Sequence, residues 1–160
     1  MTDKSESAGT SSIEAAKDAV EQIGLPSLNI LVVEDYPLNQ EVISAMLGHL
    51  GHRIDIAEDG LEAVSAVLRF RYDMILMDIH MPKMDGSTAA RRIRSLPRPE
   101  GDIPIIALTA DASMEQQKQC LASGMNDYLA KPIILPELLQ AMARCLAQGK
   151  TPDSGRGTQP

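Results

Sequence analysis

Between residues 28 and 147 the sequence alternates between short apolar runs and longer segments with helical periodicity. Most of the runs contain few polar residues, which is typical of strands that are buried on both faces of a sheet. We predict strands at 28–33, 53–56, 74–77, 103–108 and 127–130, and helices at 38–50, 60–70, 87–96, 114–122 and 135–146. Five β/α units in this order predict an α/β fold, with a doubly wound parallel sheet and right-handed crossovers.

Apolar residues recur at helical spacing in the first two predicted helices. In the first helix Leu38, Val42 and Met46 recur every fourth residue, so Val42 and Met46 are predicted to face the sheet. Leu38, near the start of the helix, is then expected to be partly exposed. The second helix has three apolar residues on one side, namely Leu61, Val64 and Leu68.

The segments that flank this region differ from it in composition. Residues 1–27 are rich in Ser, Ala and acidic residues, and residues 148–160 are mostly polar, so we expect a flexible linker and a disordered tail around a domain at 28–147. In the first segment Ser11 and Glu14 form a capping box, which predicts the start of a short helix. Its apolar face would consist of Ile13, Ala16, Val20 and Ile23. A helix this short is either a frayed linker helix or a dimerising or docking helix.

The charge of the chain argues against nucleic acid as a direct partner. The formal net charge is -7, of which residues 1–27 contribute -3 and residues 148–160 contribute +1, so -5 falls on the central region. A net negative charge repels phosphate backbones. The basic run at 91–94 is the exception, and its spacing is typical of the solvated face of a helix.

The sequence predicts neither a membrane span nor a thiol-bound metal. No apolar run approaches the roughly 18 residues that cross a bilayer, and the polar start is unlike a signal peptide. The two cysteines, Cys120 and Cys145, fall in helical segments without metal-site spacing. This pattern favours buried free thiols in a cytoplasmic protein.

Polar residues follow four of the five predicted strands. Glu34 and Asp35 follow the first strand, Asp78 the third, Thr109 the fourth and Lys131 the fifth. Each residue alone has an ordinary structural explanation, as a helix cap, a β-branched strand residue or a surface charge. Because the carboxyl ends of parallel strands meet at one rim, where such folds carry their functional sites, we expect all five side chains to converge there.

The chemistry of this set indicates phosphoryl transfer. Three carboxylates held close together repel one another unless a cation lies between them or some are protonated. Oxygen ligands with room for water suit Mg²⁺. An aspartate can attack phosphorus as a nucleophile, while the metal, Lys131 and the Thr109 hydroxyl would stabilise the charge on the transferred group.

Four stretches of the chain resemble the receiver domain of response regulators and hybrid histidine kinases, namely LVVEDYPLNQ, MDIHMPKMDG, PIIALTA and YLAKP. The resemblance spans about 28–147, in the order and at the spacing of the family. Asn39-Gln40 and the string LTADA make it most similar to the receivers of hybrid kinases. The resemblance implies a flavodoxin-like (CheY-like) sheet with strand order 2-1-3-4-5 and five helices.

The resemblance also implies which residues bind the metal and accept the phosphoryl group. Asp78 would be the phosphoacceptor, and Asp35 and Asp78 would bind Mg²⁺ directly. Glu34 would reach the metal through water, and the backbone carbonyl of His80 would be the third protein ligand. Glu34 stands where the family more often has Asp. Its longer side chain leaves the geometry of the water-mediated contact open.

The remaining implied roles concern anchoring, switching and partners. Lys131 would anchor the phosphoryl group next to a cis bond to Pro132, with Thr109 as the switch hydroxyl and Tyr128 as the rotating aromatic. The partner would be a histidine kinase or a histidine phosphotransfer protein. The apolar residues Tyr36, Pro37 and Leu38 follow the acidic pair, so Leu38 is expected either to dock this partner or to staple the start of the helix. The domain would catalyse only its own Mg²⁺-dependent phosphorylation and dephosphorylation, and weak homodimerisation is left open.

Three other classes of protein fit the sequence less well. A degenerate receiver would act only as a protein-binding module, but the filled site positions argue against it. A phosphohydrolase with an Asp nucleophile usually has a second Asp two residues further on, where this chain has His80. A flavodoxin needs a Ser/Thr/Gly loop after the first strand, where Glu34 and Asp35 would repel the flavin phosphate.

Overall fold

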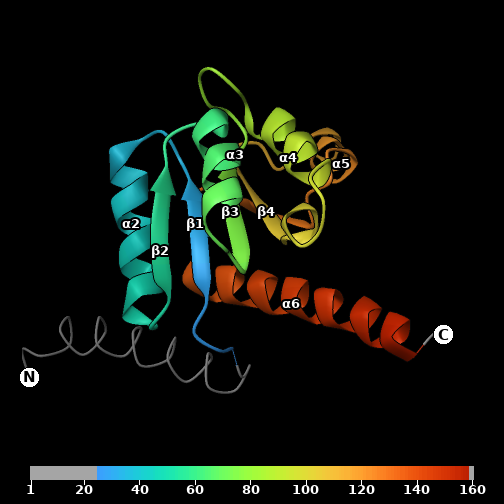
Figure 1. Cartoon of the computed structure of the whole chain (residues 1–160). Helices are drawn as coiled ribbons and strands as arrows, with labels where there is room; N and C mark the ends of the chain where they lie inside the picture. The colour runs from blue at the N-terminus through green and yellow to red at the C-terminus, as the bar shows by residue number, and fades with distance from the viewer. Residues whose placement is uncertain (1–24, 159–160) are drawn as a thin grey trace, which may run out of the picture.

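The structure, a computed structural model, describes residues 25–158, with side chains as far as Ala147. Five strands form one parallel sheet in the order β2-β1-β3-β4-β5, which confirms the predicted fold class (Figure 1). The strands are β1 (Asn29–Val33), β2 (Arg53–Ala57), β3 (Met74–Asp78), β4 (Ile105–Thr109) and β5 (Asp127–Ala130). The helices are α2 (Pro37–His49), α3 (Gly60–Arg69), α4 (Gly86–Arg94), α5 (Met114–Ala122) and α6 (Leu135–Thr158), with a short 3-10 helix η1 (Glu100–Asp102).

The helices cover both faces of the sheet, and each face has its own apolar core. One core lies under α3, α4 and α5, with Ile75 and Met77 of β3 and Ile93 of α4 fully buried. The other lies under α2 and α6, with Met74 and Leu76 of β3 buried. Successive β3 residues therefore point to opposite cores. This is why the strand is apolar throughout rather than alternating with polar residues.

The face of α2 that contacts the sheet differs from the predicted one. Ile43 and Leu47 are buried at 2% and 0% exposure, whereas Val42 is 43% exposed and Met46 is only partly buried. The prediction that Val42 and Met46 face the sheet was wrong, because the helix presents the neighbouring ridge. Leu38 is exposed, as expected.

In α3, too, the residues that face the core differ from the apolar residues that share one side of the predicted helix. Ala63 and Val67 face the core, while Leu61 and Leu68 are exposed and Val64 is half-buried.

Arg94 ends α4 and turns inward rather than joining a basic surface. Its guanidinium group donates to the carbonyls of Gly101, Ile103 and Gly124 and to the Asn126 side chain, at 2.7–3.0 Å. Only Arg91 and Arg92 of the predicted basic run are exposed.

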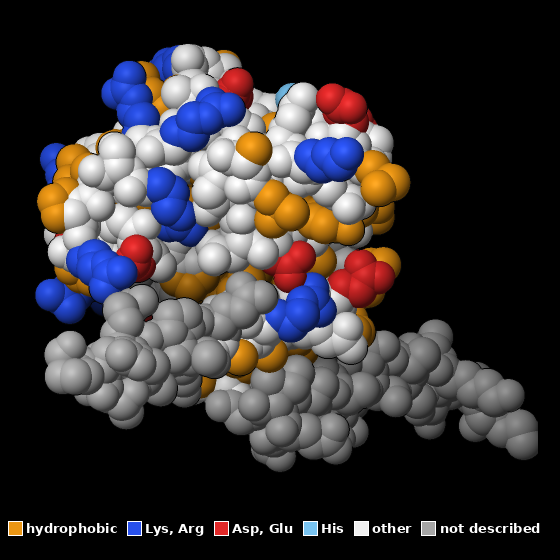
Figure 2. Space-filling view, turned by 90° about the vertical axis from the view of Figure 1, so that its right-hand side faces the viewer, with side chains coloured by type: hydrophobic (Ala, Val, Ile, Leu, Met, Phe, Trp, Pro, Cys, Tyr) orange, Lys and Arg blue, Asp and Glu red, His pale blue; other side chains and the backbone are white. Residues whose placement is uncertain are grey.

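On the face drawn in Figure 2, Lys and Arg side chains lie mostly to the left, among uncharged ones, and hydrophobic side chains gather to the right.

Some predictions about the flanking segments lie beyond what is described. The capping box and apolar face within residues 11–23 fall outside the described residues. The helix α6 continues to Thr158, past residue 146 where the sequence pattern predicts its end. The domain boundaries and the tail at 148–160 stay predictions. No helix in residues 25–158 is long and apolar enough to cross a membrane. Cys120 and Cys145 are buried free thiols, as predicted.

Candidate functional site

The carboxyl ends of the strands bring three carboxylates together. Glu34 and Asp35 follow β1 and Asp78 ends the adjacent strand β3, and one oxygen of each lies within 4.8 Å of the others. Glu34 and Asp78 are buried, at 1% and 4% exposure, and Asp35 is exposed. This cluster was expected from the sequence, and its oxygen donors suit a hard cation such as Mg²⁺.

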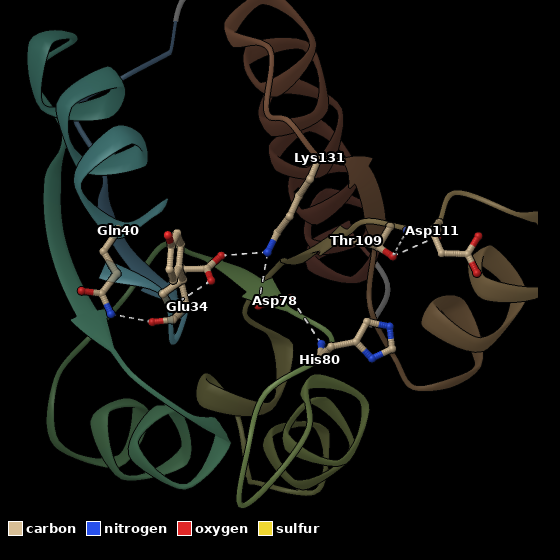
Figure 3. Close-up of polar contacts among 8 residues, drawn as sticks. Glu34, Gln40, Asp78, His80, Thr109, Asp111 and Lys131 are labelled. Atoms are coloured by element: carbon tan, nitrogen blue, oxygen red, sulfur yellow. Dashed lines mark hydrogen bonds and ion pairs between the residues drawn. The ribbon is translucent and has the colours of Figure 1, made fainter. Parts of the chain in front are cut away.

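Lys131 supplies positive charge to this cluster from the end of β5. Its ammonium nitrogen lies 3.0 Å from Glu34 Oε1 and 3.3 Å from Asp78 Oδ2 (Figure 3). Its backbone N–H donates to the Thr109 carbonyl, and the bond to Pro132 is cis, as the resemblance implies. Burial lowers the pKa of Lys131, but its hydrogen bond to Glu34 and the charge of Asp78 outweigh this effect and leave the pKa raised.

The environment of Asp78 resists a negative charge when no further cation is bound. Burial is the main cause, and the neighbouring Glu34 adds to it, so the pKa of Asp78 rises to about 6. Lys131 and the backbone N–H of His80, which donates to Asp78 Oδ1 at 3.2 Å, act in the opposite direction. A divalent cation would remove this penalty, so the donor set fits a bound metal.

The structure does not bring every predicted residue into contact with Asp78. The Thr109 hydroxyl is buried and bonded to Asp111, donating to its carbonyl and accepting from its N–H, both at 2.9 Å. Tyr128 is half-buried against the core under α4 and α5. Thr109 ends β4, and Tyr128 is the second residue of the adjacent strand β5.

Two residues for which the sequence predicted no role at the site support it. Gln40 of α2 donates its side-chain amide to the Glu34 carbonyl at 2.6 Å. Gly86, at the start of α4, packs so closely on β3 that a Cβ would collide with the Asp78 carbonyl oxygen. Neither role leaves a sequence signal of its own, because each depends on how closely two backbone segments approach.

Comparison with known proteins agrees with this geometry. The response regulator receiver domain family matches residues 30–143, so the chain belongs to that family. A probable histidine kinase 1 of Oryza sativa subsp. indica is 39% identical over 156 residues, covering 77% of this chain but only 16% of the kinase. The chain thus matches a small part of such relatives.

Two solved receiver domains are also similar. That of a sensor histidine kinase from Pseudomonas aeruginosa PAO1, with a magnesium ion in its active site cleft, is 47% identical, with a TM-score of 0.70 over 76% of this chain and 99% of that one. The receiver of Saccharomyces cerevisiae Ssk1, in complex with the histidine phosphotransfer protein Ypd1, is 34% identical, with a TM-score of 0.67 over 71% of this chain and 84% of that one.

Proposed function

We propose that this domain is the phosphoacceptor of a two-component phosphorelay and takes a phosphoryl group from phosphohistidine onto Asp78. The observation that carries the proposal is the position of Asp78, buried at the end of β3 between two other carboxylates and the Lys131 ammonium. The donor would be a histidine kinase or a histidine phosphotransfer protein. The proposal locates the domain in the cytoplasm, where thiols such as Cys120 and Cys145 stay reduced.

In the proposed reaction an Asp78 oxygen attacks phosphorus and forms an acyl phosphate. The P–N bond breaks, and its electron pair stays on the leaving imidazole. Lys131, already at the Asp78 carboxylate, would pair with a phosphoryl oxygen. Asp35, Asp78 and the His80 carbonyl would hold Mg²⁺ directly and Glu34 through water. The metal would neutralise charge on the transferred group.

A mass measurement tests the assignment of the acceptor. Incubation with acetyl phosphate and Mg²⁺ should add one phosphoryl group to the wild-type chain, and Asp78→Asn should abolish the addition. Asp85→Asn is a matched control, because Asp85 is an exposed carboxylate in the loop that follows Asp78. Its side chain caps α4 by accepting the Thr88 N–H, and Asn caps helices equally well. Undiminished loading of Asp78→Asn would refute the acceptor assignment.

A further inference from the structure

The acidic turn after β1 is held by a side chain that phosphoryl transfer itself does not use. Gln40 lies in the first turn of α2 and is half-buried. Its amide reaches back six residues and donates to the Glu34 carbonyl at 2.6 Å (Figure 3). This contact joins the start of the helix to the loop that carries two of the three carboxylates.

The Gln40 contact completes the restraint of Glu34. The Glu34 N–H donates to the Ala57 carbonyl, and its two carboxylate oxygens accept from Lys131 and from the Tyr36 N–H. With the carbonyl held by Gln40, every polar group of this buried residue has a partner inside the protein. Glu34 is therefore fixed through both its side chain and its backbone.

Asp35 is the residue to which this restraint matters most. Its side chain is exposed, and within residues 25–147 no hydrogen bond or ion pair holds its carboxylate. The Glu34 carbonyl belongs to the same planar peptide as the Asp35 N–H. Fixing that oxygen therefore fixes the plane from which the Asp35 side chain leaves the backbone.

A simpler hypothesis is that Gln40 only stabilises the start of α2, and a glutamine in α5 allows the two roles to be compared. The N-cap residue of α2, Tyr36, makes no side-chain capping bond, and the Gln40 contact ties the start of the helix to the preceding loop. Gln117 makes the same kind of contact at the start of α5, donating its amide to the Ala112 carbonyl at 2.8 Å. No carboxylate of the Glu34, Asp35 and Asp78 cluster lies in that loop.

We propose that Gln40 is a positioning residue for the metal site, and that it fixes the Glu34–Asp35 peptide so that the Asp35 carboxylate is presented to Mg²⁺. This inference rests on the proposed function, since it assigns the cluster to Mg²⁺. Residues that orient metal ligands without touching the metal typically change metal affinity by about 10–100-fold when they are removed.

The test is a calorimetric titration of the full chain with Mg²⁺, combined with melting temperatures recorded without metal. Gln40→Met keeps the length of the side chain and removes the donor, and should raise the Kd for Mg²⁺ about tenfold. Gln40→Lys restores a donor, and its affinity should exceed that of Gln40→Met. Because the added positive charge opposes Mg²⁺ binding, that recovery can come only from the donor. Gln117→Met should lower the melting temperature to a similar extent and leave the Kd near the wild-type value.

A metal-free measurement gives a second readout. In Gln40→Met the backbone amide signal of Asp35 should broaden or shift in the NMR spectrum without Mg²⁺, because its peptide is no longer held. A wild-type Kd in Gln40→Met, or equal weakening in Gln40→Met and Gln117→Met, would overturn the positioning role. If the wild-type chain itself binds no Mg²⁺ and takes up no phosphoryl group, the proposed function falls and the inference falls with it.

Discussion

His52 is a buried titratable residue far from the acidic cluster, just before β2 begins. The residue is 6% exposed, and its Nδ1 accepts the Leu28 N–H at 3.1 Å, which places the proton of the neutral ring on Nε2. Nε2 is buried and has no hydrogen-bond partner in the described part of the chain. Burial lowers the pKa of His52 below its ordinary value of 6.5. A proton on Nδ1 would also displace the Leu28 N–H.

This geometry predicts acid sensitivity of the fold. A group with a depressed folded-state pKa binds more protons when unfolded, so its contribution to stability is complete above pH 6.5 and is lost as the pH falls through the folded-state pKa. His52→Asn keeps an acceptor for the Leu28 N–H without titrating. The free energy of unfolding of the wild type should therefore fall relative to His52→Asn below pH 6.5, as measured by urea titrations across pH. Parallel pH profiles for the two proteins would contradict this.

At the scale of single elements, α2 carries two adjacent apolar ridges. One consists of Leu38 and Val42, which are exposed, and the other of Ile43 and Leu47, which are buried. Ile43→Ala should lower the free energy of unfolding by about 3 kcal/mol, because it leaves a cavity against the sheet. Val42→Ala on the neighbouring ridge should change it by less than about 0.5 kcal/mol. Urea denaturation of both variants decides which ridge is packed, and similar losses would contradict the described orientation.

The two ridges also mark the limit of what the sequence could predict. The five strands were located correctly. A short run such as Met74–Met77, apolar at every position, is typical of a strand buried on both faces. The rim residues followed from strand ends alone. The orientation of α2 did not follow, because Val42 and Ile43 are both apolar and the choice between them depends on the direction from which the sheet approaches. The contact of Gln40 with Glu34 was not predicted for a similar reason, since it depends on the path of the loop.

At the scale of the whole molecule, we predict that Thr109 and Tyr128 carry a conformational change from the site to the last two helices. The Thr109 hydroxyl is bonded to Asp111, and Tyr128 lies on the neighbouring strand, paired in register with Ala107. We predict that phosphorylation draws the hydroxyl toward a phosphoryl oxygen, breaks its bonds to Asp111 and lets the Tyr128 ring move into the vacated space. Beryllofluoride with Mg²⁺ should then shift the backbone NMR signals of residues 109–135, and unchanged signals there would rule out this route.

We predict that the proposed phosphohistidine donor docks on the exposed ridge of α2. Tyr36 and Leu38 are 56% and 57% exposed, and Val42, one helical turn after Leu38, is 43% exposed. Leu38 is only three residues from Asp35, so this apolar ridge begins beside the acidic rim. A donor must align its imidazole phosphorus with the Asp78 oxygen, which requires it to lie across this rim. We expect a small, transient interface that buries less than about 1,200 Å².

The docking site is tested by comparing two phosphoryl donors. Leu38→Asp and Val42→Asp should slow phosphoryl transfer from a histidine phosphotransfer protein by about tenfold or more, because a charge in the apolar centre of an interface is costly. Loading from acetyl phosphate should stay near the wild-type rate, since neither side chain is part of the site. Leu68→Asp is the matched control. Leu68 is 62% exposed but lies near the end of α3, which starts at the rim and runs away from it. Equal loss from both donors would mean that the α2 ridge supports the fold or the site, and equal slowing by Leu68→Asp would mean that added charge alone disturbs the encounter.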